Sequence, residues 1–139
     1  MKAKSLSTAV LFVVLLLVSA CSTAEALEDY AGLTGALEAA GESVEPGGPV
    51  EQPFLSEPGQ ILRVNGMDVQ VFEYESAEQL EADAAKISPE GGSTDTTMIT
   101  WMATPHFFKS GQLLVLYVGD DAGTLNVLES VLGEQFAGG

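Results

Sequence analysis

Basic side chains are scarce in this sequence, which has 5 lysines and arginines against 20 aspartates and glutamates in 139 residues. Proteins that bind nucleic acid or anionic lipid headgroups neutralise phosphates with clustered lysine and arginine. The composition therefore excludes a nucleic-acid partner and leaves a cationic ligand as the charge-matched possibility. Dispersed carboxylates that only keep the protein soluble explain the same composition.

Histidine and cysteine occur once each, as His106 and Cys21. A zinc site needs three or four nitrogen, sulfur or oxygen ligands, and no ligand cluster surrounds His106 in the sequence. The chain also has no Gly-x-Ser-x-Gly motif for a serine nucleophile. We therefore expect no metal, no cofactor and no catalytic residue, with His106 a hydrogen-bonded strand residue. The alternative is a small hydrolase or metal-dependent enzyme that uses His106 and nearby carboxylates.

The N-terminal segment has the order of a secretory signal. Lys2 and Lys4 precede ten consecutive apolar residues, 9–18, which are followed by the small pair Ser19-Ala20. A membrane-spanning helix needs about 20 apolar residues, whereas the apolar part of a signal peptide has about 7–15. A buried strand would also be this apolar, but two lysines at its start and the lack of turn residues around it argue against one.

The residues Val18-Ser19-Ala20-Cys21 resemble the lipobox of bacterial lipoprotein precursors, although Val18 stands where leucine is most common. The resemblance implies that Cys21 receives a diacylglycerol, that residues 1–20 are removed, and that Cys21 becomes the first residue. Two acyl chains hold a protein stably on a membrane. We then expect a location on the cell membrane or outer membrane, on its extracytoplasmic side. The alternative is an ordinary signal peptide cut near Ala20.

Loss of residues 1–20 would leave Arg63, Lys86 and Lys109 against 20 acidic residues, a formal net charge of −17. Residues 21–29 are then expected to carry the lipid anchor and a short tether. Residues 30–139 have the length of one ordinary domain, so we expect a single domain there.

Three segments have the apolar periodicity of helices. The first lies within residues 28–41, where Gly41 is expected to close the helix. The second lies within residues 76–89, where Ser76 and Gln79 have the spacing of a capping box and Ala77 belongs to the expected buried stripe. The third begins after Asp120-Asp121 and ends near Gly133; these aspartates are read as a helix cap in preference to a calcium site.

A first hairpin is predicted within residues 61–74 by Asn65-Gly66, which supplies the two positive φ angles of a type I′ turn. The register then pairs Val64 with Met67 and places apolar side chains on one face of the sheet.

A second hairpin is predicted from strands 98–108 and 113–118, with a turn at Ser110-Gly111 that places Phe108 opposite Leu113. Residues 113–118 are apolar at every position, so this strand is expected to be covered on both faces. A short strand at Ser43-Val44 and polar loops elsewhere complete the pattern.

The order α-β-β-β-α-β-β-α predicts an α+β fold, a mostly antiparallel sheet of two hairpins packed with about three helices. The stretches within residues 36–47, 61–74 and 113–119 resemble small bacterial lipoproteins, a resemblance that implies no activity.

Aromatic residues near the two hairpins are the candidate contacts with a partner. These are Phe72, Tyr74, Trp101, His106 and Phe108. Aromatic residues are enriched at binding hot spots, although on strands they also serve as core. We therefore expect a binding or interaction module without catalysis, anchored through Cys21, whose partner is an envelope protein or a cationic ligand.

Overall fold

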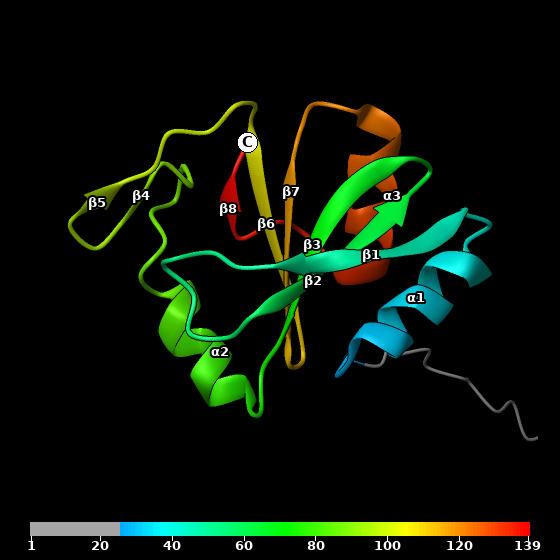
Figure 1. Cartoon of the computed structure of the whole chain (residues 1–139), viewed down its shortest axis with the longest axis horizontal. Coiled ribbons are helices and arrows are strands. Elements are labelled where there is room, and N and C mark those ends of the chain that lie inside the picture. The colour runs from blue at the N-terminus through cyan, green and yellow to red at the C-terminus, as the bar shows by residue number, and fades with distance from the viewer. Residues whose placement is uncertain (1–25) are drawn as a thin grey trace, which may run out of the picture.

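The structure is a computed structural model that describes residues 26–139 (Figure 1). The expectations for residues 1–20, for Cys21 and for most of the tether lie outside the described residues. The described part contains three helices, a six-stranded antiparallel sheet and a separate two-stranded hairpin, which confirms the predicted α+β class.

The strand order in the main sheet is β1-β2-β3-β7-β6-β8, and every neighbouring pair is antiparallel. Its strands are β1 (Val44–Val50), β2 (Gly59–Val64), β3 (Met67–Glu73), β6 (Pro105–Ser110), β7 (Leu113–Val118) and β8 (Ala137–Gly138). The small hairpin consists of β4 (Ser93–Thr94) and β5 (Thr97–Met98). The helices are α1 (Tyr30–Ala39), α2 (Ala77–Ala84) and α3 (Ala122–Leu132).

The main sheet is covered on both faces, with α1 and α3 on one side and α2 on the other (Figure 1). Side chains between the sheet and the helix pair form what we call the α1/α3 core, which includes Leu37, Val71 and Leu128. The opposite face carries the α2 core, which includes Phe72 and Leu80. Strand β7 contributes to both cores, and its residues Leu113–Tyr117 are buried as predicted.

The first hairpin confirms the register predicted from its turn. Asn65 and Gly66 have φ angles of 50° and 85°, and Val64 pairs with Met67. Because Phe72 lies on the face opposite to Val71, it points into the α2 core. The second face of this hairpin is therefore also part of a core at Phe72.

The second hairpin has a different turn from the predicted one, and the predicted register is wrong by two residues. Phe108 pairs with Val115, and Ser110 pairs with Leu113. The turn residues are Gly111, with φ 56°, and Gln112, so the glycine comes first, as in type II′ turns. Because side chains alternate with period two, the shift leaves every side chain on the expected face.

Further elements differ from the sequence analysis. The β4–β5 hairpin lies in a segment expected to be a polar loop, since strands of two residues are too short for periodicity to reveal. Strand β1 is longer than predicted and has seven residues, starting at Val44. It tolerates Pro46 and Pro49 because it is an edge strand and its pairing shifts between these two residues. The predicted strand 98–108 begins only at Pro105, which has no N–H to continue the ladder toward the N-terminus. Strand β8 is new, and two residues are too short for periodicity to reveal.

Each helix begins at an aspartate or serine whose side chain accepts a hydrogen bond from the first turn. The caps are Asp29, Ser76 and Asp121. In α2 the Ser76 side chain accepts from Gln79 N, but the return bond of the predicted capping box is not among the hydrogen bonds of residues 26–139. The predicted stripe of α2 is also wrong at one position, since Ala77 is exposed while Asp83 is buried.

Two glycine substitutions should change stability in opposite directions. Gly111→Ala would force alanine into a left-handed conformation and against the carbonyl of Leu27, so we expect a loss of about 2 kcal/mol in the free energy of unfolding. Gly35→Ala lies within α1 with open space around it, so we expect a gain of about 0.5–1 kcal/mol. Urea unfolding measures the free energy of unfolding of both variants. A change of the same sign in both would contradict the described backbone.

Candidate functional site

The aromatic residues that the sequence analysis singled out do not form one surface. Phe72, Tyr74 and Phe108 are at most 3% exposed, and Phe108 lies on the face of the sheet opposite to the other two. His106 is 7% exposed, while Trp101 is half-buried. Of these five side chains, Trp101 therefore offers the most surface to a partner.

Trp101 belongs to an aromatic cluster over the α2 core. Its ring lies edge-on to Phe54 and Phe107, with centroids 6.1 and 5.9 Å away, and its Nε1 donates a hydrogen bond of 2.7 Å to the Gly91 carbonyl. Phe54 was not predicted as a site residue, because it lies in a proline-rich connection without any periodic pattern. The cluster fixes the irregular segment 99–104 against the sheet.

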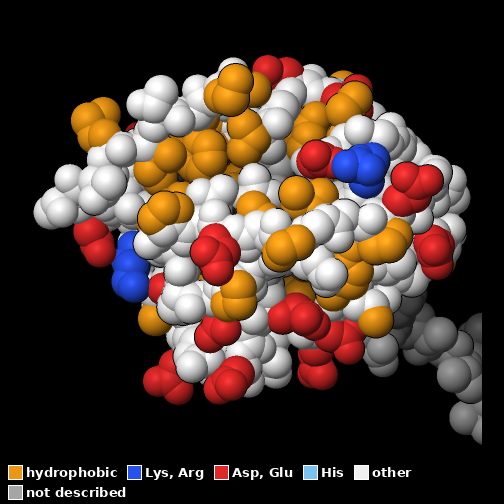
Figure 2. Space-filling view, in the orientation of Figure 1, with side chains coloured by type: hydrophobic (Ala, Val, Ile, Leu, Met, Phe, Trp, Pro, Cys, Tyr) orange, Lys and Arg blue, Asp and Glu red, His pale blue; other side chains and the backbone are white. Residues whose placement is uncertain are grey.

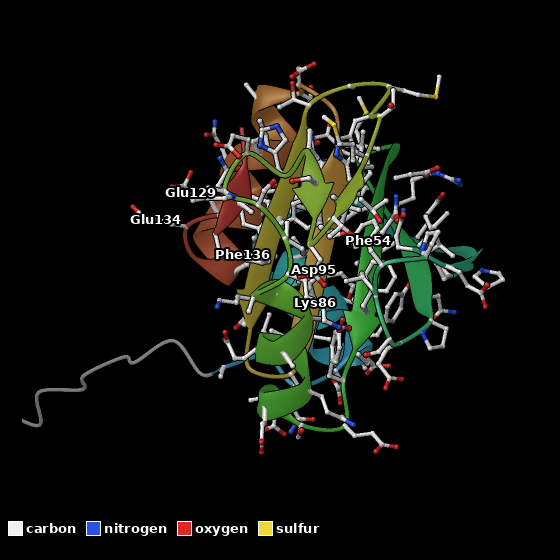
Figure 3. The ribbon with its side chains drawn as sticks, turned by 90° about the vertical axis from the view of Figure 1, so that its left-hand side faces the viewer. Phe54, Lys86, Asp95, Glu129, Glu134 and Phe136 are labelled. Carbon is white, nitrogen blue, oxygen red and sulfur yellow. The ribbon has the colours of Figure 1, made fainter. Side chains whose placement is uncertain are left out.

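A cleft of about 570 Å³ lies beside this cluster, between the β1–β2 connection and the β4–β5 hairpin. We call it the hairpin cleft. Phe54, Lys86 and Asp95 lie on the same side of the molecule (Figure 3). The cleft is lined by Gln52, Pro53, Phe54, Lys86, Thr94, Asp95, Thr96, Thr97, Met98, Ile99 and Thr100. Hydroxyl and amide groups thus alternate with apolar side chains along its walls.

One exposed methionine lines the hairpin cleft, and a second follows it along the chain. Met98 is 85% exposed, and Met102, four residues further on, is fully exposed. Hydrophobic side chains gather on the upper left of the space-filling view, on the side where β4 and β5 lie, whereas acidic side chains gather along its lower edge (Figure 2). The hairpin end is therefore the apolar end of this face.

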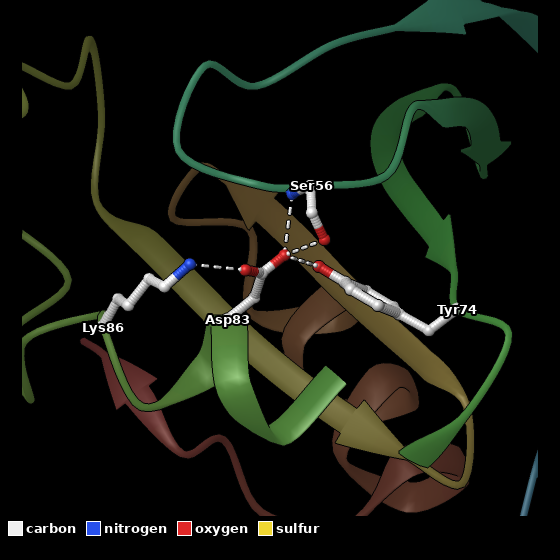
Figure 4. A network of polar contacts seen from close by, with 4 residues as sticks. All are labelled: Ser56, Tyr74, Asp83 and Lys86. Carbon is white, nitrogen blue, oxygen red and sulfur yellow. Dashed lines mark hydrogen bonds and ion pairs between the residues drawn. The ribbon is translucent and has the colours of Figure 1, made fainter. Parts of the chain in front are cut away.

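A buried carboxylate holds one wall of the hairpin cleft in place (Figure 4). Asp83 of α2 is 3% exposed, and its Oδ2 accepts hydrogen bonds from the N–H and hydroxyl of Ser56, both 2.7 Å, and from the Tyr74 hydroxyl at 2.9 Å. Its Oδ1 accepts a hydrogen bond of 3.0 Å from Lys86 Nζ. Asp83 thereby joins the β1–β2 connection to α2 and orients a lysine that lines the cleft.

The pKa values in this network follow from burial and hydrogen bonding. Burial alone would raise the pKa of Asp83, but the hydrogen bonds from Ser56, Lys86 and Tyr74 outweigh it and lower the pKa below its usual value. Burial raises the pKa of Tyr74 far above its usual value, and the hydrogen bond to Asp83 raises it further. The carboxylate therefore stays ionised and the phenol stays protonated.

A second hollow, of about 350 Å³, lies on the α1/α3 side of the sheet. We call it the histidine hollow; it is lined by His106, Phe108, Leu125, Glu129, Glu134 and Gln135. His106 Nδ1 lies 2.7 Å from Gln135 Oε1, so it donates its proton there, and within the described residues the buried Nε2 has no hydrogen-bond partner. Glu129 and Glu134 project outward at the left edge of Figure 3.

The described part of the chain holds its few basic residues in ion pairs. Arg63 pairs with Asp68, Lys86 with Asp83, and Lys109 with Glu81. The other carboxylates of residues 26–139 have no lysine or arginine partner, so the surface carries an uncompensated negative charge. Such a surface attracts basic partners and repels anionic ones.

Among residues 26–139, no helix is long and apolar enough to cross a membrane. The same residues contain no group of three or more histidine, cysteine or acidic side chains placed to hold a metal ion. Comparisons of the chain with protein-family models, with curated proteins and with solved structures find no match. The site must therefore be interpreted from its own geometry.

Removal of the Asp83 carboxylate should destabilise the fold and loosen the cleft wall. Asp83→Ala leaves the Tyr74 hydroxyl and the Ser56 N–H without their acceptor, so we expect a loss of about 3 kcal/mol. The exposed Glu38→Ala on α1 is the control and should change stability by less than about 0.5 kcal/mol. Denaturant unfolding at pH 7 compares them, and an equal effect of the two substitutions would contradict the network.

The contribution of Asp83 to the free energy of unfolding should depend on pH in the acid range. Because the pKa of Asp83 is lower in the folded protein than the ordinary aspartate pKa of about 3.9, ionised Asp83 stabilises the fold above that value. The stabilisation is lost as the pH falls toward the folded pKa. We therefore expect the stability difference between wild type and Asp83→Asn to be constant from pH 7 to about pH 5 and to shrink below about pH 4. Unfolding curves across this range measure it; a difference that grows on acidification would contradict the described hydrogen bonds.

Proposed function

We propose that this protein is a lipid-anchored extracytoplasmic binding module of the bacterial envelope that acts without catalysis and docks a protein partner at the hairpin cleft. The lipobox-like residues 18–21 support the anchor. The cleft supports the docking site, because it combines apolar side chains with hydroxyl and amide groups that form hydrogen bonds without a net charge.

The observation that carries this proposal is the exposure of Met98, which lines the cleft, together with that of Met102, four residues further along the chain. Burial of a methionine side chain contributes about 1.5–3 kcal/mol, so a partner that covers these two exposed methionines would gain free energy of binding. Methionine is flexible and polarisable, which suits it to contacts with a partner surface. Phe54 also lines the cleft, and its ring is held edge-on against Trp101.

A charge placed at the apolar rim should abolish docking. In protein extracted with detergent from the native membrane, we expect Met98→Asp to lose the partner that co-purifies with the wild type, since a carboxylate would have to be desolvated at the contact. Met67→Asp is the matched control, because Met67 is also exposed but begins β3, directly after the β2–β3 turn. The proposal is wrong if both substitutions leave the partner's yield unchanged.

A second candidate function is a small hydrolase, and the histidine hollow is the observation that favours it. His106 and two glutamates line one concavity there, as a general base with neighbouring acids would require. Because Nδ1 carries the imidazole proton and donates it to Gln135, Nε2 has a lone pair with which it could accept a proton. However, Nε2 is buried in the described structure, so a substrate would have to displace part of the rim.

Substitution of His106 separates the two functions. If the cleft acts by binding alone, His106→Ala protein whose fold is verified by circular dichroism should keep the co-purifying partner. A hydrolase at the histidine hollow requires the opposite pattern, in which cleavage of model esters and glycosides by the wild type falls at least about 100-fold in the variant. Detection of that loss with the fold intact would replace the binding module by the enzyme.

A further inference from the structure

We propose that the hairpin cleft faces away from the membrane, so that Met98 and Met102 meet a basic protein and not lipid. This inference rests on the proposed function, because it assumes that Cys21 carries the lipid. Exposed apolar side chains on an anchored protein can insert into the bilayer or contact a partner, and the proposed orientation favours contact with a partner.

The first observation is that the chain enters the domain at a fixed point. Leu27 N donates to the Ser110 hydroxyl at 3.1 Å, and its carbonyl accepts from Gln112 N at 3.2 Å. Gly111 lies so close to the Leu27 carbonyl that a side chain there would collide with it. These contacts hold Leu27, among the first described residues, against the β6–β7 turn.

The second observation is that this entry point and the cleft lie on opposite faces of the main sheet. Leu27 packs against the α1/α3 core, whereas Phe54 and Trp101 pack against the α2 core. In Figure 1, α1, which follows the entry point, lies on the right, and β4 and β5 lie at the left end of the longest axis. The cleft is therefore on the side of the sheet opposite to the entry point.

The tether is too short to reach around the domain and bring its opposite side to the bilayer. Six residue steps separate Cys21 from Leu27, so the chain between them spans at most about 21 Å even when fully extended. A folded domain of this length is roughly 35 Å across. The lipid anchor therefore keeps the entry side of the domain nearest to the bilayer.

The surroundings of the cleft indicate that this partner is basic. A second concavity shares Gln52 and Pro53 with the hairpin cleft and is lined by Glu51 and Glu57. Neither glutamate is in an ion pair with a basic residue of the described part. A partner that places an apolar side chain in the cleft can therefore place lysine or arginine beside these carboxylates.

The orientation is testable because Trp101 is the only tryptophan in the chain. In vesicles that hold the lipidated protein, we expect lipids brominated along their acyl chains to leave Trp101 fluorescence unchanged. The control combines Trp101→Phe with Glu28→Trp, which places a tryptophan beside the entry point; this variant should lose more of its fluorescence to the same lipids. Equal quenching of the two proteins would overturn the orientation.

The kind of partner is tested by cross-linking in intact cells. A photoreactive benzoylphenylalanine at Met98 should form adducts with a protein that mass spectrometry identifies as having a net positive charge. The same residue at Met67 is the control and should not form that adduct. Adducts only with phospholipid, an acidic partner, or no protein adduct specific to position 98 would each overturn the proposal.

Failure of the anchor and failure of the orientation give different results. Without the anchor, the wild-type protein appears in the soluble fraction after cell lysis, as Cys21→Ser protein is expected to. With the anchor intact but the orientation wrong, the protein stays with the membrane and brominated lipids quench Trp101.

Discussion

The fold depends on one strand that is buried on both faces. β7 joins the two hairpins of the sheet, since it pairs with β3 on one side and β6 on the other. Its side chains alternate between the α1/α3 core and the α2 core, so both cores form together or not at all. Two helices close one face of this sheet, but a single eight-residue helix and irregular segments close the other. The hairpin cleft lies among these irregular segments, because they pack less completely than helices.

Local chemistry explains why much of this fold could be predicted from the sequence. Asn65-Gly66 fixes a turn through its φ angles, Ser76 and Asp121 begin helices through their own side chains, and the apolar run of β7 requires two covered faces. The second hairpin could not be placed in the same way. Ser110-Gly111 and Gly111-Gln112 are both acceptable turns, and the choice depends on how β6 packs against β7 over its whole length.

The site was much less visible in the sequence. Asp83 stands in a polar helix among other acids, and nothing in its neighbourhood indicates that Ser56 and Tyr74 fold onto it. Phe54 lies in a connection without periodicity, and the cleft lining comes from segments more than thirty residues apart. Such sites arise from tertiary packing, which no local pattern encodes. Conversely, Phe72 and Phe108 were candidate contact residues because they are aromatic and near the hairpins, and both lie in the cores.

The acidic surface, the contacts of Leu27 with the β6–β7 turn and the cleft on the opposite face of the sheet are consistent with the proposed protein, which presents one side to partners while the other is held at a membrane. The proposed orientation requires a lipid at Cys21. The most direct measurement is the mass of the mature N-terminal peptide from protein extracted from its native membrane. We predict a peptide that begins at Cys21 and carries a diacylglycerol on the cysteine sulfur. A chain that begins at another residue, or an unmodified thiol at Cys21, would contradict the proposed anchor.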